Sequence, residues 1–117
     1  SIAHSPNAVA AAVSTEGRIG IDVEVRSPYD PDVGNLVLTP RQQSSVEGSV
    51  DPEDLFLRLW TRKEAIGKAL GVGIDDDVLA CDAENERVAL RGKLLHVTEL
   101  PAPDNCRAAL AVELIRP

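Results

Sequence analysis

The stretch Ile19–Arg26, with the sequence IGIDVEVR, decides the fold, because its apolar and polar residues alternate without interruption. An alternation of period two is typical of a β-strand, in which successive side chains point to opposite faces. One face carries four β-branched apolar residues, and the other carries Gly20, Asp22, Glu24 and Arg26. We therefore predict a half-buried strand here.

The residues before this strand contain a second apolar run, Asn7–Ser14 (NAVAAAVS), between Pro6 and a Thr-Glu-Gly turn. We interpret this run as a buried strand, although its alanines leave a helix open as an alternative. Two neighbouring strands joined by a short turn are typical of a hairpin, so we expect the run to pair with Ile19–Arg26.

Turn and cap residues divide the next part of the chain. The segment Ser27–Asn35 contains two prolines, two aspartates and a glycine, which predicts a loop. Thr39 followed by proline is a helix-start signal and Gly48 is a stop signal, so we predict a short helix over about Pro40–Glu47.

A long helix is predicted from the Asp51-Pro52 signal to Leu70, where Gly71 ends it. Its apolar stripe consists of Leu55, Leu59, Ile66 and Leu70, with Phe56 and the stem of Lys63 alongside. Trp60, Glu64 and Lys68 recur every four residues and therefore stack on one adjacent face.

Three further strands are predicted after this helix: Val78–Asp82, Arg87–Glu99, which is either one strand or two strands divided at Gly92, and Arg107–Ile115. The order of the predicted elements indicates an α+β fold, in which an antiparallel sheet has one long helix packed on a face. A length of 117 residues fits one domain over residues 1–117.

The composition excludes several classes of protein. A formal net charge of −7 and three aromatic residues argue against a nucleic-acid binder, because acidic side chains repel phosphates. No apolar run approaches the roughly 20 residues of a membrane span, so we expect no membrane partner. Cys81 and Cys106 are expected to be free thiols in a reducing cytoplasm rather than a disulfide. Because the chain starts at Ser1 and contains no methionine, we expect a processed chain or an excised domain.

Asp22 and Glu24 form the first candidate site. Two carboxylates at i and i+2 on one face of a strand lie about 6–7 Å apart, close enough to share a cation. Gly20 precedes them on the same face, where its missing side chain would let a ligand or another backbone come close. The same pattern also fits an ordinary solvated strand face.

The second candidate site is the helix segment that ends in Glu64 and Lys68. These two residues are ordered as a stabilising i,i+4 pair, which would need no ligand. Gly67 in the middle of the helix costs about 1 kcal/mol relative to alanine, which suggests that something needs close access to this face. A carboxylate flanked by Lys63 and Lys68 suits a metal-bound pyrophosphate, with oxygen for Mg²⁺ and cations for phosphoryl charge.

His4 and Ser5 form the third candidate. An adjacent serine and histidine do not make a hydrolase dyad without an acid that orients the histidine. A lone histidine is more often a polar residue without a catalytic role. The sequence contains no dinucleotide-binding, P-loop, zinc-protease or nucleophile-elbow motif.

Three motifs follow one another in the chain: SIAHS at residues 1–5, IGIDVE at 19–24 and WTRKEAIGK at 60–68. Together they resemble the Sfp type of the 4′-phosphopantetheinyl transferase superfamily, with its SHS-like segment, GIDxE strand and WxxKExxxK helix. The small holo-acyl-carrier-protein synthases are similar in the last two motifs and in the KALGVGI stretch after the helix. The resemblance covers residues 1–74.

The resemblance implies a reaction. The phosphopantetheine arm of coenzyme A would be transferred, with Mg²⁺, to a serine of an acyl or peptidyl carrier protein of fatty-acid or polyketide biosynthesis. The implied metal ligands are Asp22, Glu24 and Glu64. The implied contacts to coenzyme A are His4, Ser5, Lys63 and Lys68. Glu64, or a metal-held water, would be the base, and the implied catalytic residues are Glu64, Asp22 and Lys68.

Enzymes of the Sfp type have two similar halves with the active site between them, and this chain resembles the second half. We therefore expect it to form a dimer or trimer, or to pair with a missing N-terminal half. Carrier proteins are generally acidic, as this chain is, so we expect a tethered carrier or docking through a local patch. The candidates for this patch are Arg26, Arg41, Arg58, Arg62 and Leu36–Leu38.

Other classes of function remain as alternatives. The chain could be a non-catalytic half that serves assembly or carrier binding. A Mg²⁺-dependent hydrolase of nucleotide pyrophosphates, or a serine hydrolase built on His4 and Ser5, would use some of the same residues.

Overall fold

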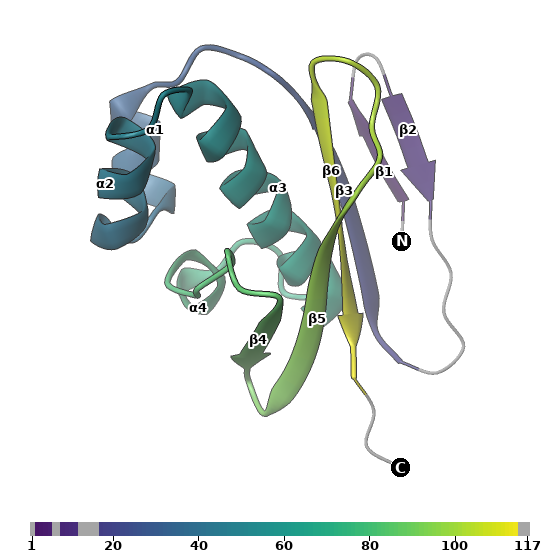
Figure 1. Cartoon of the computed structure of the whole chain (residues 1–117). Coiled ribbons are helices and arrows are strands. Elements are labelled where there is room, and N and C mark those ends of the chain that lie inside the picture. The colour runs from purple at the N-terminus through teal and green to yellow at the C-terminus, as the bar shows by residue number, and fades with distance from the viewer. Residues whose placement is uncertain (1, 6–7, 12–16, 115–117) are drawn as a thin grey trace.

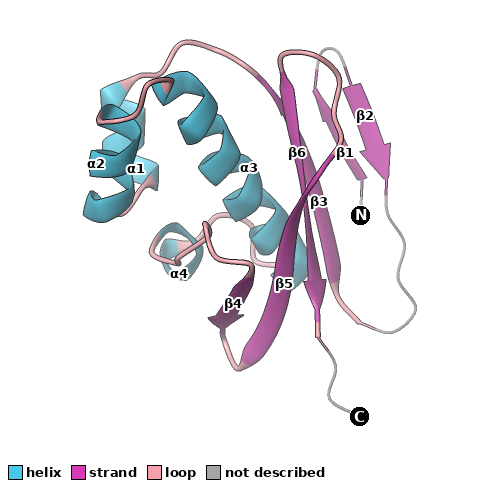
Figure 2. Ribbon diagram, viewed as in Figure 1, coloured by secondary structure: helices cyan, strands magenta, loops and turns pink. Residues whose placement is uncertain are grey.

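The computed structural model describes residues 2–5, 8–11 and 17–114, which form an α+β fold as predicted (Figures 1 and 2). The strands are β1 (Ile2–Ser5), β2 (Ala8–Ala11), β3 (Ile19–Val25), β4 (Arg87–Leu90), β5 (Lys93–Leu100) and β6 (Cys106–Glu113). The helices are α1 (Pro31–Val37), α2 (Pro40–Glu47), α3 (Pro52–Leu70) and α4 (Asp76–Leu79). None of the described helices is both long and apolar enough to cross a membrane.

Four strands form an antiparallel sheet in the order β3-β6-β5-β4. The predicted strand at Ile19–Arg26 is confirmed as β3, but its predicted hairpin with the run before it is wrong. β3 pairs with β6 along its whole length, from Ile19 opposite Val112 to Val25 opposite Cys106. β2, the described part of the earlier run, pairs with β1 in a separate two-stranded sheet beside β3 (Figure 1). The sequence reading missed β1, and this strand is the partner that β2 uses.

The helix α3 lies along one side of the sheet, and it faces the polar side of β3 (Figure 1). A Cβ atom at Gly20 would lie 2.1 Å from the backbone oxygen of Ala65 and 2.4 Å from the backbone nitrogen of Ala69. Only glycine allows this approach, so the predicted close contact at Gly20 is with another backbone. Asp22 and Glu24 therefore share a strand face with the helix, and this face is not an ordinary solvated one.

The main core lies between α3 and the sheet. From α3 it contains Ala65, Ile66, Ala69 and Leu70, and from the sheet it contains Val88, Leu95, Val97, Ala109 and Ala111. A smaller cluster on the opposite face of β3 contains Ile21, Val23 and Ala108. Both faces of β3 are thus covered, so that Asp22 is buried and Glu24 is half-buried.

The ends of α3 lie where the cap signals predict. The Asp51 side chain accepts a hydrogen bond from the backbone nitrogen of Asp54 at 3.3 Å. Gly71 ends the helix with a φ of 72°, a left-handed conformation that favours glycine. The short helix α2 begins at Thr39, which forms a capping box with Gln42. Both helix predictions are confirmed.

Two segments differ from the sequence prediction. The expected loop at 27–35 contains the start of α1. Asp30 caps this helix, because its side chain accepts a hydrogen bond from the backbone nitrogen of Asp32, and Pro31 is the first helical residue. The expected strand Val78–Asp82 is instead α4 and the turn after it. Here the Asp75 side chain accepts from the backbone nitrogen of Val78 at 3.0 Å. In both places a local aspartate cap satisfies the first backbone N–H groups and favours a helix.

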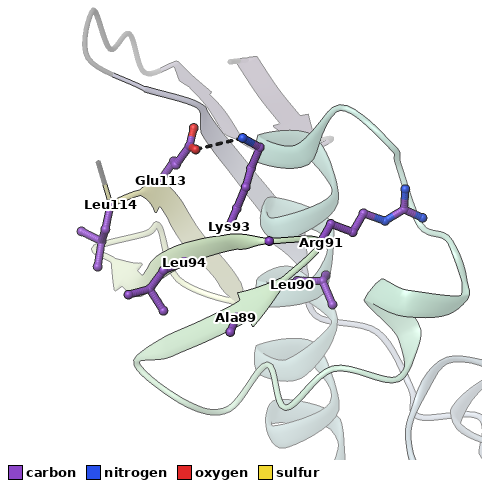
Figure 3. Close-up of a pocket in the computed structure, with 8 residues that line it drawn as sticks. Ala89, Leu90, Arg91, Lys93, Leu94, Glu113 and Leu114 are labelled. Carbon is purple, nitrogen blue, oxygen red and sulfur yellow. Dashed lines mark hydrogen bonds and ion pairs between the residues drawn. The ribbon is translucent and has the colours of Figure 1, made fainter. Parts of the chain in front are cut away.

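The last three strands agree with the prediction at 87–113. Arg91 and Gly92 have φ values of 53° and 74°, which are typical of a two-residue hairpin turn, and they divide β4 from β5. Leu94 and Leu114 are among the residues that line a pocket beside this turn (Figure 3). At its edge the Lys93 ammonium pairs with Glu113 at 3.1 Å.

Candidate metal and phosphate site

The candidate site lies where β3 faces the second half of α3. β3 supplies Asp22 and Glu24, and α3 supplies Glu64 and Lys68. Asp22 and Lys68 are in direct contact, and the charges of Asp22, Glu24 and Glu64 act on one another. The structure thus brings together four of the residues that the sequence analysis selected, from segments about forty positions apart.

Asp22 is the most deeply buried member of the site, with 5% of its surface exposed. Its Oδ1 accepts a hydrogen bond from the Lys68 ammonium at 3.0 Å. Its Oδ2 is buried and has no hydrogen-bond partner among the described residues. Burial removes water from a carboxylate oxygen, and without a replacement partner this is costly. The orphaned oxygen is therefore a position where a cation would be strongly stabilised.

Burial raises the pKa of all three carboxyl groups, and the charge of Asp22 adds to the rise at Glu24 and at Glu64. Burial raises the pKa of Glu24 to about 7, and the charges of Asp22 and Glu64 add to the effect. Burial also raises the pKa of Asp22. Burial and the charge of Asp22 raise the pKa of Glu64. The positive charge of Lys68 opposes all three shifts, which shows that it acts on the whole group.

The donor atoms of this group suit Mg²⁺, which prefers carboxylate oxygens. They are not closed around an ion, because no three His, Cys, Asp or Glu side chains in residues 17–114 are gathered tightly enough to hold one. The buried free oxygen of Asp22 and the excess negative charge nevertheless fit a divalent cation. Asp22, Glu24 and Glu64 are the residues that would hold it.

Lys63, which was expected to contact phosphate, lies elsewhere. Its side chain is completely buried, and its ammonium donates hydrogen bonds to Val37 O at 2.8 Å, Gln42 Oε1 at 2.8 Å and Leu79 O at 2.5 Å. These acceptors belong to α2, to α4 and to the end of α1, and Figure 1 shows α1 and α2 on the side of α3 away from β3. The structure corrects the phosphate role, because the Lys63 ammonium is fully used in joining helices.

Arg62 is a second buried cation of α3, with 4% of its surface exposed. Its guanidinium donates to the backbone oxygens of Ala83, Asn85 and Val97. Arg62 therefore cannot belong to an exposed docking patch, as the sequence analysis suggested. Leu36, from the same suggested patch, is 72% exposed.

Gly67 makes room for the protein's own backbone. A Cβ atom there would lie 2.2 Å from the carbonyl oxygen of Gly73, in the loop that follows α3. Something does need close access to this face of the helix, as predicted, but the occupant is this loop rather than a ligand.

His4 and Ser5 lie on β1, which runs beside β3. Their side chains lie outside the described part of the chain, so their contacts stay a prediction. The other histidine, His96, pairs with Glu86 at 2.9 Å, and both cysteines are free thiols.

Sequence reasoning missed one contact at the site. It paired Lys68 with Glu64 along the helix, whereas the ammonium binds Asp22 on β3. The signal for this contact is Gly20, which lies two residues before Asp22 on the same strand face. A glycine at that position lets the helix pass directly over the strand and brings Lys68 to Asp22.

Comparison with known proteins decides the family. The sequence model of the 4′-phosphopantetheinyl transferase superfamily matches residues 18–107, which include all of β3 and α3. The chain belongs to this superfamily. The resemblance that the three motifs carry is confirmed.

Several phosphopantetheinyl transferases are similar in sequence. HetI of Nostoc is 32% identical over 119 residues, which cover 95% of this chain and 50% of HetI. AcpT of Salmonella typhimurium is 36% identical over 74 residues, which cover 60% of this chain and 38% of AcpT. AcpT of Escherichia coli is 31% identical over 106 residues, which cover 76% of this chain and 54% of AcpT. The chain spans about half the length, or less, of these transferases.

Two solved structures share the transferase fold. The holo-[acyl-carrier-protein] synthase of Neisseria meningitidis matches 84% of this chain and 98% of its own, with a TM-score of 0.66 and 18% identity. The synthase of Thermotoga maritima matches 85% of this chain and 64% of its own, with a TM-score of 0.60 and 20% identity. At these identities the likeness concerns the fold.

Proposed function

We propose that this chain is the metal- and coenzyme A-binding lobe of a 4′-phosphopantetheinyl transferase. The enzyme would transfer the phosphopantetheine arm of coenzyme A to a serine of an acyl or peptidyl carrier protein. The observation that carries the proposal is the buried, unpartnered oxygen of Asp22 beside Lys68 and two further carboxylates. Membership of the superfamily supports the class of reaction.

In this proposal Asp22, Glu24 and Glu64 hold Mg²⁺. When bound, the ion would neutralise charge on the pyrophosphate of coenzyme A and so favour departure of adenosine 3′,5′-bisphosphate. The carboxylates come from a strand and a helix that are locked together at Gly20. Rigid elements are well suited to hold such a group in position.

Lys68 supplies positive charge for the phosphates of coenzyme A. About a third of its side chain is exposed, so its ammonium can reach a ligand at the surface. His4 and Ser5 on the neighbouring β1 are proposed to contact coenzyme A as well. Lys63 has no part in this binding, because its ammonium is buried among helices.

Glu64 is the proposed base that takes the proton from the carrier serine. In the metal-free chain, burial and the charge of Asp22 raise the pKa of Glu64, so before Mg²⁺ binds its carboxylate holds a proton more tightly than an exposed glutamate does. Asp22 stays next to Lys68 and is the less suitable base of the two.

The chain spans about half of its relatives, so we propose that a second lobe completes the site. This lobe is either another copy of the chain, in a dimer or trimer, or an N-terminal half that precedes it. The two free thiols support a reducing, cytoplasmic setting. Sedimentation with and without coenzyme A would show whether copies of the chain associate.

Mass spectrometry of an apo carrier protein tests the reaction. The carrier is incubated with the chain, coenzyme A and Mg²⁺, and a gain equal to the mass of the phosphopantetheine arm is expected. Glu64→Gln should abolish this gain, whereas Glu47→Gln, an exposed glutamate on α2, should not. Retained activity in Glu64→Gln would remove Glu64 from the mechanism.

A non-catalytic lobe is the main alternative, and binding separates it from the enzyme. A transferase lobe should bind coenzyme A more tightly with Mg²⁺ than without, whereas a scaffold should show no metal-dependent binding. Rapid breakdown of coenzyme A without a carrier would instead indicate a pyrophosphate hydrolase.

A further inference from the structure

We infer that Lys68 is a resident cation on Asp22, and that a divalent ion displaces it and thereby frees it to bind the phosphates of coenzyme A. The inference rests on the proposed function and adds an order of events to it. Lys68 and the metal would compete for one carboxylate, so that binding of the ion and binding of phosphate favour each other.

The geometry of the ion pair points to this exchange. The Lys68 ammonium lies 3.0 Å from Asp22 Oδ1, and the Asp22 side chain is only 7% exposed whereas that of Lys68 is 34% exposed. The buried partner is fixed on β3, and the flexible partner reaches the surface from α3. Lys68 can therefore leave by turning its side chain outward, without moving either backbone.

The charges at the site favour a divalent ion over the ammonium. Three carboxylates face one ammonium, which leaves an excess of negative charge that a doubly charged ion balances better. Asp22 Oδ2 offers such an ion a free oxygen while Oδ1 is still held by Lys68. Two cations on one carboxylate repel each other, so entry of the ion at Oδ2 would drive Lys68 off Oδ1.

Released Lys68 is placed to meet a phosphate. Its ammonium would lose Asp22 as a partner but stay close to the divalent ion, to which the pyrophosphate of coenzyme A would also bind. A phosphate oxygen restores a charge-assisted hydrogen bond to it. Coenzyme A would in turn draw Lys68 away from Asp22 and so strengthen binding of the ion.

Chemical labelling tests the exchange with internal controls, because the other two lysines of the chain are a matched ion pair and a buried side chain. Lys93 is the matched control, because its ammonium lies 3.1 Å from a carboxylate oxygen of Glu113 and its side chain is 36% exposed (Figure 3). Lys63 is the buried control, because its side chain is completely buried. The chain is acetylated with limiting acetic anhydride, and each lysine is quantified by peptide mass spectrometry. Saturating Mg²⁺ should raise the labelling rate of Lys68 severalfold and leave Lys93 and Lys63 unchanged. Mg²⁺ with inorganic pyrophosphate should protect Lys68 again. If Mg²⁺ binds without raising the labelling of Lys68, the exchange is wrong.

Metal binding by variants gives a second, independent test. Binding of Mn²⁺ alone is measured by electron paramagnetic resonance for the wild type, Lys68→Gln, Lys68→Arg and Lys93→Gln. Since a neighbouring charge changes the affinity of a carboxylate for a cation by about tenfold or more, Lys68→Gln should bind Mn²⁺ at least that much more tightly. Lys68→Arg and Lys93→Gln should resemble the wild type.

The outcomes separate this inference from the proposed function. If Lys68→Gln binds Mn²⁺ no better than the wild type, the inference is overturned even when coenzyme A still binds and the carrier is still modified. If the wild type binds coenzyme A no more tightly with Mg²⁺ than without, the proposed function fails, while tighter Mn²⁺ binding by Lys68→Gln would still support the competition at Asp22.

Discussion

Replacing Gly20 with alanine tests how the site is spaced. A Cβ atom at this position would lie 2.1 Å from Ala65 O, and real Cβ atoms essentially never come closer than 3.0 Å to such an atom. To increase the distance between this Cβ atom and Ala65 O from 2.1 Å to 3.0 Å, α3 has to move away from β3 by about 0.9 Å. Overpacking of this kind costs about 1–3 kcal/mol of the free energy of unfolding.

The same shift should damage the site more than the fold. Functional groups must be held within about 0.5 Å of their working positions, and a misplacement of about 1 Å can cost about 100-fold in rate. We therefore expect Gly20→Ala to lower the rate of phosphopantetheine transfer about 100-fold. Mg²⁺-dependent binding of coenzyme A, measured by calorimetry on folded protein, should weaken as well.

Gly67→Ala is the matched control for this variant. Its Cβ atom would meet Gly73 O at 2.2 Å, almost the same clash on the same helix, but against a loop. Alanine also gains about 1 kcal/mol in a helix interior relative to glycine. Gly67→Ala should lose some stability in denaturant unfolding and keep its binding of coenzyme A. Wild-type binding by Gly20→Ala, or equal loss of binding in both variants, would refute the spacing argument.

Three further perturbations have definite expected results. First, the metal-free chain should lose stability as the pH rises from about 4.5 to 7, because Glu24 has a pKa of about 7 when folded and binds a proton more tightly than in the unfolded chain. The loss should reach about 3 kcal/mol between pH 4.5 and 8 in denaturant unfolding with a chelator, and a flat profile in that range would contradict it. Saturating Mg²⁺ or Glu24→Gln should reduce this decline. Second, Lys63→Met leaves three oxygens, which are buried or partly buried, without their donor, so it should cost about 3 kcal/mol in denaturant unfolding, while coenzyme A affinity of the folded protein stays unchanged. A large loss of affinity in folded Lys63→Met would restore its phosphate role. Third, burial raises the pKa of Cys81 to about 11, so a thiol reagent at pH 8 should modify Cys106 first and Cys81 only after unfolding. Simultaneous modification of both thiols in the native chain would show that Cys81 is accessible.

Much of the fold could be predicted from local signals. The errors of the prediction concern which strands pair with each other and the assignment of short segments. The caps at Thr39 and Asp51 mark helices because the side chains satisfy backbone N–H groups without help from the rest of the protein. Asp30 before Pro31 is the same signal as Asp51 before Pro52, yet the density of turn residues concealed it. The partner of β3 could not be predicted, because β6 lies more than eighty residues away in the sequence.

In the candidate site, too, local sequence signals predict some features, and other features depend on the tertiary structure. Asp22, Glu24, Glu64 and Lys68 meet because strand and helix periodicities place them on facing surfaces. Lys63 has the same chemistry as Lys68, and its burial depends on how α1, α2 and α4 pack around it. No spacing within the motif distinguishes the two lysines. Only the tertiary structure assigns one to the site and the other to the interior.

The neighbouring buried cations Arg62 and Lys63 have a consequence for genetics. Their hydrogen bonds hold loops and helices together, so a substitution at either position should give a temperature-sensitive protein that recovers function on cooling. A substitution at Glu64 should leave the melting temperature almost unchanged and abolish function at every growth temperature. A mutant collection scored at two temperatures would therefore sort the charged residues of this one helix into two phenotypes.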